Sequence, residues 1–374
     1  MNVPWFILLS IPFVLYVVFS LLLSYGLGRK NPIIQNPHFP VTVIVAARNE
    51  AENILACLQS LEELDYSENL LEIIIVNDRS EDRTGQIINE FIKEKSQFKY
   101  FNITKTIPNL SGKASAISQA IDQSQGEIIF ITDADCVVPK NWIKKTILYF
   151  TGQVGMVAGF TLLCFSRGFF NKIQNLDWAY LLSVAAGAAG LSIPLTCMGN
   201  NFAFRRSVYK QVGGYQGVGF SVTEDFALLN AISQHTNWKI LFSIDKECLV
   251  KTNPMITFRD FFSQRKRWAV GGQSVHWFGK LLIGLSIITN FIFIGSFFFS
   301  QNYIFILSLF LSILIGDYLL VQSLMARLNE RACLKYLPFY RIFFIFYSTI
   351  LIFDLLFTQK VTWKGIQYRS DQHS

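Results

Sequence analysis

Long apolar runs lie near both ends of the chain, and a more polar block with mixed patterns lies between them. The first run covers residues 4–25, and three others cover residues 281–299, 303–325 and 337–357. Each is long enough for a bilayer-spanning helix, which needs roughly 20 apolar residues. The pattern predicts an N-terminal anchor, a central domain and a C-terminal membrane region.

Within the central block, short apolar runs alternate with segments of helical periodicity. The expected strands cover residues 41–46, 71–76, 98–103, 127–132, 154–163 and 239–243. The expected helices cover residues 50–64, 113–122 and 223–234, with a further helix capped by Ser80. Strands that alternate with helices predict an α/β fold with a mainly parallel sheet.

Two further helices are expected beside the membrane. Residues 169–191 are rich in Ala and Gly, and we predict a helix near the membrane surface. Residues 257–271 form an amphipathic helix with basic and aromatic faces, suited to the interface. The expected divisions are an anchor (1–27), a central domain (28–255), an interfacial helix (256–279), a region of about three membrane helices (280–358) and a polar tail (359–374).

Positive charge is concentrated next to the apolar runs. The net charge is +7, and the basic residues beside these runs include Arg29, Lys30, Arg327 and Arg331. This distribution is typical of the cytoplasmic side of a membrane protein, and it does not favour nucleic acid as a partner. Because the charges follow the first apolar run, they favour an anchor over a cleaved signal peptide and place the central block in the cytoplasm.

The polar tail poses a topological conflict. Three spans after a cytoplasmic domain would put the tail outside, whereas Lys360, Lys364 and Arg369 favour the inside. Either one apolar run does not cross fully, or the charge rule does not hold here.

Three aspartates follow two of the expected strands. Asp78 ends the strand that starts at Leu71, and Asp133 and Asp135 follow the strand of residues 127–132. Ligands bind at the carboxyl ends of parallel strands, and hard oxygen ligands suit Mg²⁺ or Mn²⁺ with a diphosphate. The alternative is that each aspartate is a turn or cap residue. The chain has neither GxGxxG after its first strand nor a complete GxxxxGK[ST] motif, which disfavours a dinucleotide site and a P-loop.

Other polar residues lie at or on the expected helices. Lys113, at a helix start, is either a phosphate or base ligand or a solvated lysine. Asp225 opens another helix, where a carboxylate is also a common cap. Gln264, Arg267 and Trp268 are spaced i, i+3 and i+4, so they share a helix face that suits a diphosphate and a sugar. A basic face against anionic lipid is the alternative.

The order and spacing of these residues resemble the family-2 glycosyltransferases with a GT-A fold, in particular their membrane-integrated branch. That branch includes cellulose, chitin, hyaluronan and poly-N-acetylglucosamine synthases and ceramide glucosyltransferases. The matching segments are residues 43–50, 78–84, 112–114, 133–135, 199–206, 223–225 and 264–268. Residues 361–365 also look like a tail of such enzymes, although Ile366 stands where Arg is expected.

The resemblance implies a role for each matched side chain. A UDP-sugar would be bound by Arg48, Glu50, Asp78, Lys113 and Asp133. Asp135 would be the metal ligand, for Mg²⁺ or Mn²⁺, and Asp225 would be the catalytic base. The diphosphate and the acceptor would be bound by Glu224, Gln264, Arg267 and Trp268.

The expected function is therefore transfer of a sugar, with inversion, to a lipid or lipid-linked glycan at a membrane, most simply a bacterial inner membrane. One alternative is a processive polysaccharide synthase. A non-enzyme alternative is a nucleotide-sensing transporter or scaffold, for which Asp317 inside an apolar run is the best support. Asp317 and Asp354 could bind sugar hydroxyls or serve only in packing.

Overall fold

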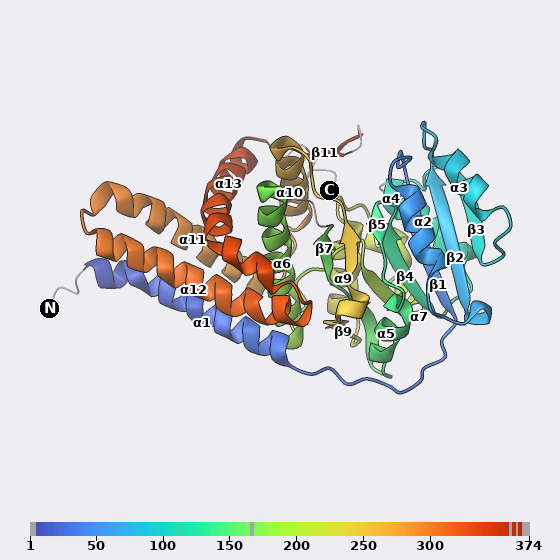
Figure 1. The fold of residues 1–374 in the computed structure, drawn as a ribbon, viewed down its shortest axis with the longest axis horizontal. Coiled ribbons are helices and arrows are strands. Elements are labelled where there is room, and N and C mark those ends of the chain that lie inside the picture. Colours follow the sequence, from blue (N-terminus) through green and yellow to red (C-terminus); the bar gives the residue numbers. More distant parts are fainter. Residues whose placement is uncertain (1–4, 111, 165–167, 359–360, 364–365, 369–374) are drawn as a thin grey trace.

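The computed structural model describes residues 5–110, 112–164, 168–358, 361–363 and 366–368. A sheet domain and a group of long helices lie end to end, with α6 (Phe169–Gly190) and α10 (Phe258–Gly271) between them (Figure 1).

A seven-stranded mixed sheet forms the centre of the domain, in the order β3-β2-β1-β4-β8-β6-β9. Its strands are β1 (Val41–Ala47), β2 (Leu71–Asp78), β3 (Phe98–Ile103), β4 (Ile128–Asp133), β6 (Val154–Ala158), β8 (Phe202–Arg205) and β9 (Lys239–Phe242). The first four strands of that order are parallel, and β8 is antiparallel to both its neighbours. Their Val- and Ile-rich runs are covered on both faces, as parallel sheets require.

Helices cover both faces of this sheet. One face packs against α2 (Ile54–Glu62), α3 (Thr84–Ile92) and α5 (Trp142–Thr146). The other packs against α4 (Gly112–Gln123), α6, α7 (Arg206–Gln211) and α9 (Glu224–His235). Short elements complete the domain: α8 (Gly214–Val218), η1 (Glu68–Leu70), η2 (Ile147–Tyr149) and η3 (Lys246–Cys248).

Two helix starts differ from the sequence-based expectation. The helix expected from Glu50 begins at Ile54, and the helix expected after Ser80 begins at Thr84. Ser80 is not its cap, because the Ser80 hydroxyl accepts a hydrogen bond from the backbone N–H of Asn49 at 3.0 Å. The loop after β1 and the loop after β2 are instead joined to each other by hydrogen bonds of this kind.

The single strand expected over residues 154–163 is wrong, because the chain breaks after Ala158. β7 (Thr161–Leu163) joins β5 (Cys136–Val137) and β10 (Val250–Thr252) in a separate small sheet. The Asn201 side chain lies against Gly159, where a Cβ would come within 2.5 Å of it. Asn201 also donates to the Phe160 carbonyl at 2.7 Å, which stabilises the break.

Within the described residues, four helices are long and apolar enough to cross a membrane: α1 (Trp5–Gly28), α11 (Trp277–Phe299), α12 (Tyr303–Arg327) and a segment from η4 (Arg331–Tyr336) through α13 (Leu337–Phe357). One is at the N-terminus and three follow the sheet domain, as expected. In Figure 1, α1, α11 and α12 run alongside one another, whereas α13 runs across them.

The Ala- and Gly-rich sequence of α6 allows a close helix crossing. A Cβ on Gly187 would lie 2.5 Å from the Leu23 carbonyl oxygen of α1, and a Cβ on Gly190 would lie 2.0 Å from that of Gly26. Only glycine permits this approach of two backbones, so α6 is fixed against the end of α1 nearest the sheet domain.

Both ends of α13 contact elements at the boundary with the sheet domain. Near its start, Phe169 of α6 packs against Phe339. Near its end, Asp354 forms an ion pair with Lys266 of α10 at 2.6 Å. The following hairpin, β11 (Val361–Trp363) with β12 (Ile366–Tyr368), also lies beside α10. The arrangement favours the alternative in which one apolar run does not cross fully; Lys360, Lys364 and Arg369 lie outside the described residues.

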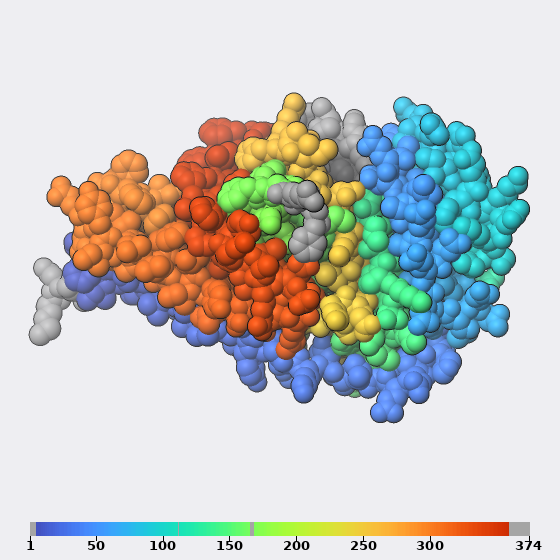
Figure 2. Space-filling view, in the orientation of Figure 1, coloured from blue at the N-terminus to red at the C-terminus, as the bar shows by residue number. Residues whose placement is uncertain are grey.

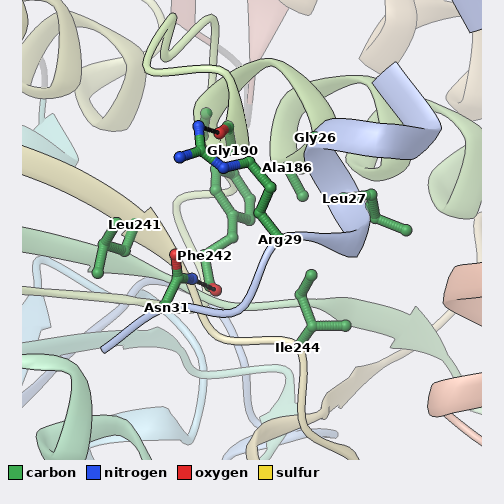
Figure 3. Close-up of a pocket in the computed structure, with 10 residues that line it drawn as sticks. Gly26, Leu27, Arg29, Asn31, Ala186, Gly190, Leu241, Phe242 and Ile244 are labelled. Atoms are coloured by element: carbon green, nitrogen blue, oxygen red, sulfur yellow. Dashed lines mark hydrogen bonds between the residues drawn. The ribbon is translucent and has the colours of Figure 1, made fainter. Parts of the chain in front are cut away.

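The segment between α1 and β1 is fastened along the domain surface. Arg29 donates to the Gly190 carbonyl at 3.0 Å and Asn31 to the Phe242 carbonyl at 3.1 Å, beside a small cavity (Figure 3). Farther on, the Ile34 N–H donates to the Leu148 carbonyl at 2.8 Å. The space-filling view shows this N-terminal segment, in blue, following one side of the molecule from the helices to the sheet domain (Figure 2).

Candidate active site

The ends of three parallel strands bring the predicted nucleotide-binding residues to one edge of the sheet. Ala47 of β1 pairs with Asn77 of β2, and Ala46 pairs with Asp133 of β4. Arg48 directly follows β1 and Asp78 ends β2, so both lie at the same edge as Asp133. This is the edge at which open α/β sheets bind ligands.

Lys113 joins two carboxylates from different elements. Its ammonium, in the first turn of α4, lies 2.6 Å from Asp133 of β4 and 2.8 Å from Glu224 of α9. Burial acts to raise the pKa of Glu224, but the Lys113 charge and hydrogen bond outweigh it and lower that pKa. The pKa of Lys113 is raised by the same two carboxylates, against the effect of burial. Lys113 is therefore a charged bridge at the centre of the site, and not a solvated helix-end lysine.

Asp135 lies in a cluster of negative charge. Its carboxylate accepts a weak hydrogen bond from the Thr252 hydroxyl at 3.3 Å. Burial, followed by the negative charges of Asp133 and Glu50, raises the pKa of Asp135 to about 6. Such repulsion is relieved when a cation binds between the carboxylates.

The carboxylates can supply part of a metal site. Among the described residues, no three His, Cys, Asp or Glu side chains converge as a ready-made set of ligands. Mg²⁺ in particular usually takes only one or two protein carboxylates, together with water and substrate phosphates. Asp133 and Asp135 therefore fit a divalent cation whose coordination a diphosphate would complete.

Asp225 is the other carboxylate with a strongly raised pKa. Burial and the neighbouring Glu224 charge raise the pKa of Asp225 to about 7, although Lys113 and Arg267 act in the opposite direction. Gly199 leaves room beside it, since a Cβ there would lie 3.1 Å from the Asp225 Oδ2 atom. A carboxylate with a pKa near neutrality is suited to accept a proton.

Asp78 is buried beside a glycine and an arginine. A Cβ on Gly112 would lie 2.9 Å from the Asp78 Oδ2 atom, while Arg79 Nε donates to Oδ1 at 2.9 Å. Arg79 has a φ of 56°, a backbone conformation that few non-glycine residues adopt. The adjacent loop is fixed by a hydrogen bond from the Glu50 N–H to Thr84 at 2.8 Å.

The three motif side chains of α10 are placed differently. Arg267 is near Glu224 and Asp225, since its charge lowers the pKa of both. Trp268 packs edge-on against Trp178 of α6, with ring centroids 5.4 Å apart. The side-chain amide oxygen of Gln264 accepts a hydrogen bond from the Arg265 guanidinium. A Cβ on Gly271 would meet Thr223, so the end of α10 packs closely on the start of α9.

Sequence reasoning missed a polar cluster behind this motif. Arg265 is buried and paired with Asp177 of α6, and Tyr347 of α13 also donates to Asp177. The available signal was Asp177 itself, a carboxylate in a segment otherwise dominated by apolar and small residues. A buried carboxylate needs a cationic partner, but the sequence does not reveal which one.

The two acids of the apolar runs are in ion pairs. Asp317 accepts from the Tyr16 hydroxyl at 2.5 Å and lies 3.7 Å from Arg341. Asp354 is the partner of Lys266. These contacts support the packing interpretation of both residues.

Comparisons with known proteins agree with this geometry. The sequence matches the family described as Glycosyl transferase family 2 over residues 42–213, and Glycosyl transferase family group 2 over residues 128–357. It is 31% identical over 239 residues to the probable glycosyltransferase YdaM of Bacillus subtilis, covering 63% of this chain and 56% of the relative. It is 29% identical over 247 residues to a poly-beta-1,6-N-acetyl-D-glucosamine synthase of Staphylococcus epidermidis, covering 63% and 55%. The matches thus span little more than half the length of these relatives.

A solved structure shares the fold. The mannosyltransferase PcManGT from Pyrobaculum calidifontis, in complex with GDP-Man and Mn²⁺, gives a TM-score of 0.63 at 18% identity, over 94% of this chain and 98% of that one. The likeness at this identity concerns the fold alone. The expected GT-A fold with flanking apolar helices is confirmed.

Proposed function

Since this chain belongs to the family-2 glycosyltransferases, we propose that it transfers a sugar from a UDP-sugar to a membrane-associated acceptor, with inversion. The observation that carries the proposal is the position of Asp225. It is a partly buried carboxylate whose pKa is raised to about 7, next to Arg267 and to the Glu224 that Lys113 links to Asp133. The acceptor is a lipid or a lipid-linked glycan.

Asp225 acts as the general base. An acceptor hydroxyl is a poor nucleophile until its proton is removed, and a carboxylate with a pKa near the working pH can take that proton as the hydroxyl attacks. The oxygen forms a bond to the anomeric carbon while the bond from that carbon to the diphosphate breaks. One displacement inverts the centre, so an α-linked donor gives a β-linked product.

Cationic groups receive the leaving diphosphate. Arg267 can pair with its oxygens, because a guanidinium binds phosphate through two parallel hydrogen bonds. Asp135, with Asp133 beside it, would hold Mg²⁺ or Mn²⁺. When bound, the metal would stabilise the charge that develops on the diphosphate.

The nucleotide is assigned to the edge formed by β1 and β2. Asp78, with Arg48 and Glu50 nearby, would bind the uracil or ribose, and Lys113 would hold the diphosphate side. PcManGT is described with GDP-Man, so the base is the part of the donor that most needs a direct test.

The position of α10 supports an acceptor from the bilayer. This helix lies between the sheet domain and the long apolar helices, and Ile256 just before it exposes 92% of its surface. A site bordered by such a helix is open to molecules at the membrane surface.

A second candidate is a processive synthase that extends a β-linked polysaccharide. Similarity to poly-beta-1,6-N-acetyl-D-glucosamine synthases of Staphylococcus favours it. The two candidates share the chemistry of each step and differ in whether the product remains bound.

Purified full-length protein in lipid nanodiscs tests both. Labelled UDP-glucose, UDP-N-acetylglucosamine and GDP-mannose are offered with Mn²⁺, bacterial lipid and soluble glycan acceptors. We expect labelled product from a UDP-sugar only, and we expect it in the lipid fraction. One sugar per acceptor supports single transfer. A long polymer supports the processive alternative. Transfer from GDP-mannose alone would overturn the assigned donor, and no transfer from any donor would overturn the proposed activity.

A further inference from the structure

Arg265 lies in the interior of the protein, at one of the two positions that separate Gln264 from Arg267. Only 4% of its surface is exposed. Its Nε atom donates to the Asp177 Oδ2 atom at 2.6 Å, and Nη2 lies 2.5 Å from the same oxygen. A buried guanidinium of this kind is stable only because its charge is compensated there.

Asp177 is held in place from a second side. The hydroxyl of Tyr347 in α13 donates to the Asp177 Oδ1 atom at 2.7 Å. Both carboxylate oxygens are thus engaged, one by α10 and one by α13. The orientation of the Arg265 guanidinium is therefore determined by three helices together.

The same guanidinium contacts two of the three motif side chains. Its Nη1 atom donates to the Gln264 Oε1 atom at 2.5 Å, and its central carbon lies 4.2 Å from the Trp268 ring centroid. Arg265 occupies one lone pair of the Gln264 amide oxygen and so fixes which side of the amide faces it; the NH₂ group of that amide, which can only donate, is on the other side. Trp268 is enclosed between Arg265 and Trp178.

We propose that Arg265 is a positioning residue that makes Gln264 a hydrogen-bond donor toward the substrate and fixes the Trp268 indole. Asp177 and Tyr347 set the angle of the guanidinium, and the guanidinium sets the two motif side chains. The group that this arrangement would recognise is an acceptor of hydrogen bonds, a phosphate or sugar oxygen. The inference rests on the proposed function and adds to it the residue that orients the acceptor side of the site.

A simpler role would be an ion pair that only attaches α10 to α6. Arg265→Lys separates the two, because lysine keeps the charge opposite Asp177 but lacks the planar fork needed to reach Asp177 and Gln264 together. A purely structural pair would be largely restored by lysine. A positioning role would not.

The experiment uses full-length protein in nanodiscs and compares wild type with Arg265→Lys, Gln264→Ala and the double variant. Arg259→Gln, an exposed arginine on the same helix, is the matched control. We expect Arg265→Lys to lower kcat by about tenfold or more, with an unchanged donor Kd and an unchanged unfolding midpoint. Adding Gln264→Ala to Arg265→Lys should cost little more, because both act through one contact.

A second readout does not depend on turnover. The contribution of Trp268 to tryptophan emission, obtained by difference from Trp268→Phe, should change in Arg265→Lys and stay unchanged in Arg259→Gln. If wild type transfers no sugar, the proposed function fails, while this spectrum still tests the positioning. Wild-type kcat in Arg265→Lys, or fully additive losses in the double variant, would overturn the inference.

A further variant separates loss of activity from loss of folding. Arg265→Gln combined with Asp177→Asn removes both charges, so no buried charge remains unpaired. We expect this variant to fold and to show the same loss of kcat. Failure of both it and Arg265→Lys to fold would show that the pair is a structural clamp, against the inference.

Discussion

Charged side chains that are wholly or partly shielded from solvent are arranged differently in the sheet domain and among the helices beside it. At the candidate active site the carboxylates outnumber the cations; the carboxylates are Glu50, Asp133, Asp135, Glu224 and Asp225, and the cations are Arg48, Lys113 and Arg267. On the helix side, each carboxylate of α6, α12 and α13 within the described residues has its own cation; the pairs are Asp177–Arg265, Asp317–Arg341 and Asp354–Lys266. One region carries an excess of negative charge and the other is balanced.

The difference separates two uses of a carboxylate that is shielded from solvent. Burial and, after it, repulsion from neighbouring carboxylates raise the pKa of Asp135 to about 6 and that of Asp225 to about 7. That repulsion costs stability and is relieved by protons, a metal or a substrate. The helix-side pairs have no such surplus, so they hold helices together in one arrangement, and the Asp177–Arg265 pair is proposed also to orient Gln264 and Trp268.

The largest expected effect is on turnover, from Asp225→Asn. The amide keeps the shape of the carboxylate but cannot accept the proton of the acceptor hydroxyl, so we expect sugar transfer to fall by about 10³-fold. Donor binding and the unfolding midpoint should not decrease, because the change also removes repulsion with Glu224. Labelled-product formation and thermal unfolding measure the two. Wild-type turnover would refute the role of Asp225, and lost donor binding would reassign it.

On the helix side, Asp317→Ala should lower the free energy of unfolding. It leaves the buried Arg341 without its carboxylate, at a cost of about 3 kcal/mol or more. Unfolding in detergent should shift accordingly, and Asp317→Leu with Arg341→Leu should recover most of the loss. Equal stability of Asp317→Ala and wild type would mean that this pair does not hold the helices, and the contrast between the two regions would lose its basis.

Removal of divalent cations should affect the active site alone. We expect chelation to lower sugar transfer by more than about tenfold, since a bound metal stabilises the leaving diphosphate, and Mn²⁺ or Mg²⁺ to restore it. Asp135→Asn should weaken this restoration, while Asp354→Asn should not. Full activity in chelator would show that the carboxylate excess serves no metal.

The smallest expected effect is the acid limb of the pH profile. Asp225 must be deprotonated to act as base, so kcat/KM should fall about tenfold per pH unit below about pH 7 and level off above it. The groups that bear on this carboxylate are Glu224, Lys113, Arg267, Cys197 and Tyr215. Glu224→Gln should move the limb to lower pH, because it removes the neighbouring negative charge. A limb that stays in place in Glu224→Gln would assign the titration to another group.

Most of the sheet could be predicted from the sequence because its strands are continuous apolar runs. The edge at which Asp78 and Asp133 meet follows from the same pattern, since both residues close parallel strands. The break at Gly159 could not be predicted, because its cause is Asn201, which is distant in the sequence. The start of α3 at Thr84 depends on contacts with the loop after β1, which are equally non-local.

The sequence predicts which residues belong to the site better than it predicts how they are arranged. Motif spacing selects Lys113, Asp133 and Glu224, but only the fold shows that one ammonium bridges the two carboxylates. The sequence does not single out Arg265, because nothing in a helical pattern tells a buried arginine from an exposed one. Its significance depends on Asp177, which lies on another helix.

The segment that connects α1 to β1 determines how far the sheet domain lies from the long apolar helices. Arg29, Asn31 and Ile34 form hydrogen bonds with α6, β9 and η2, so the segment lies against the domain and restrains it relative to α1. Under the proposed function, Asp225 would then lie at a constant distance from the membrane helices. Only acceptor hydroxyl groups at that distance would reach it, so the length of the acceptor would contribute to its selection.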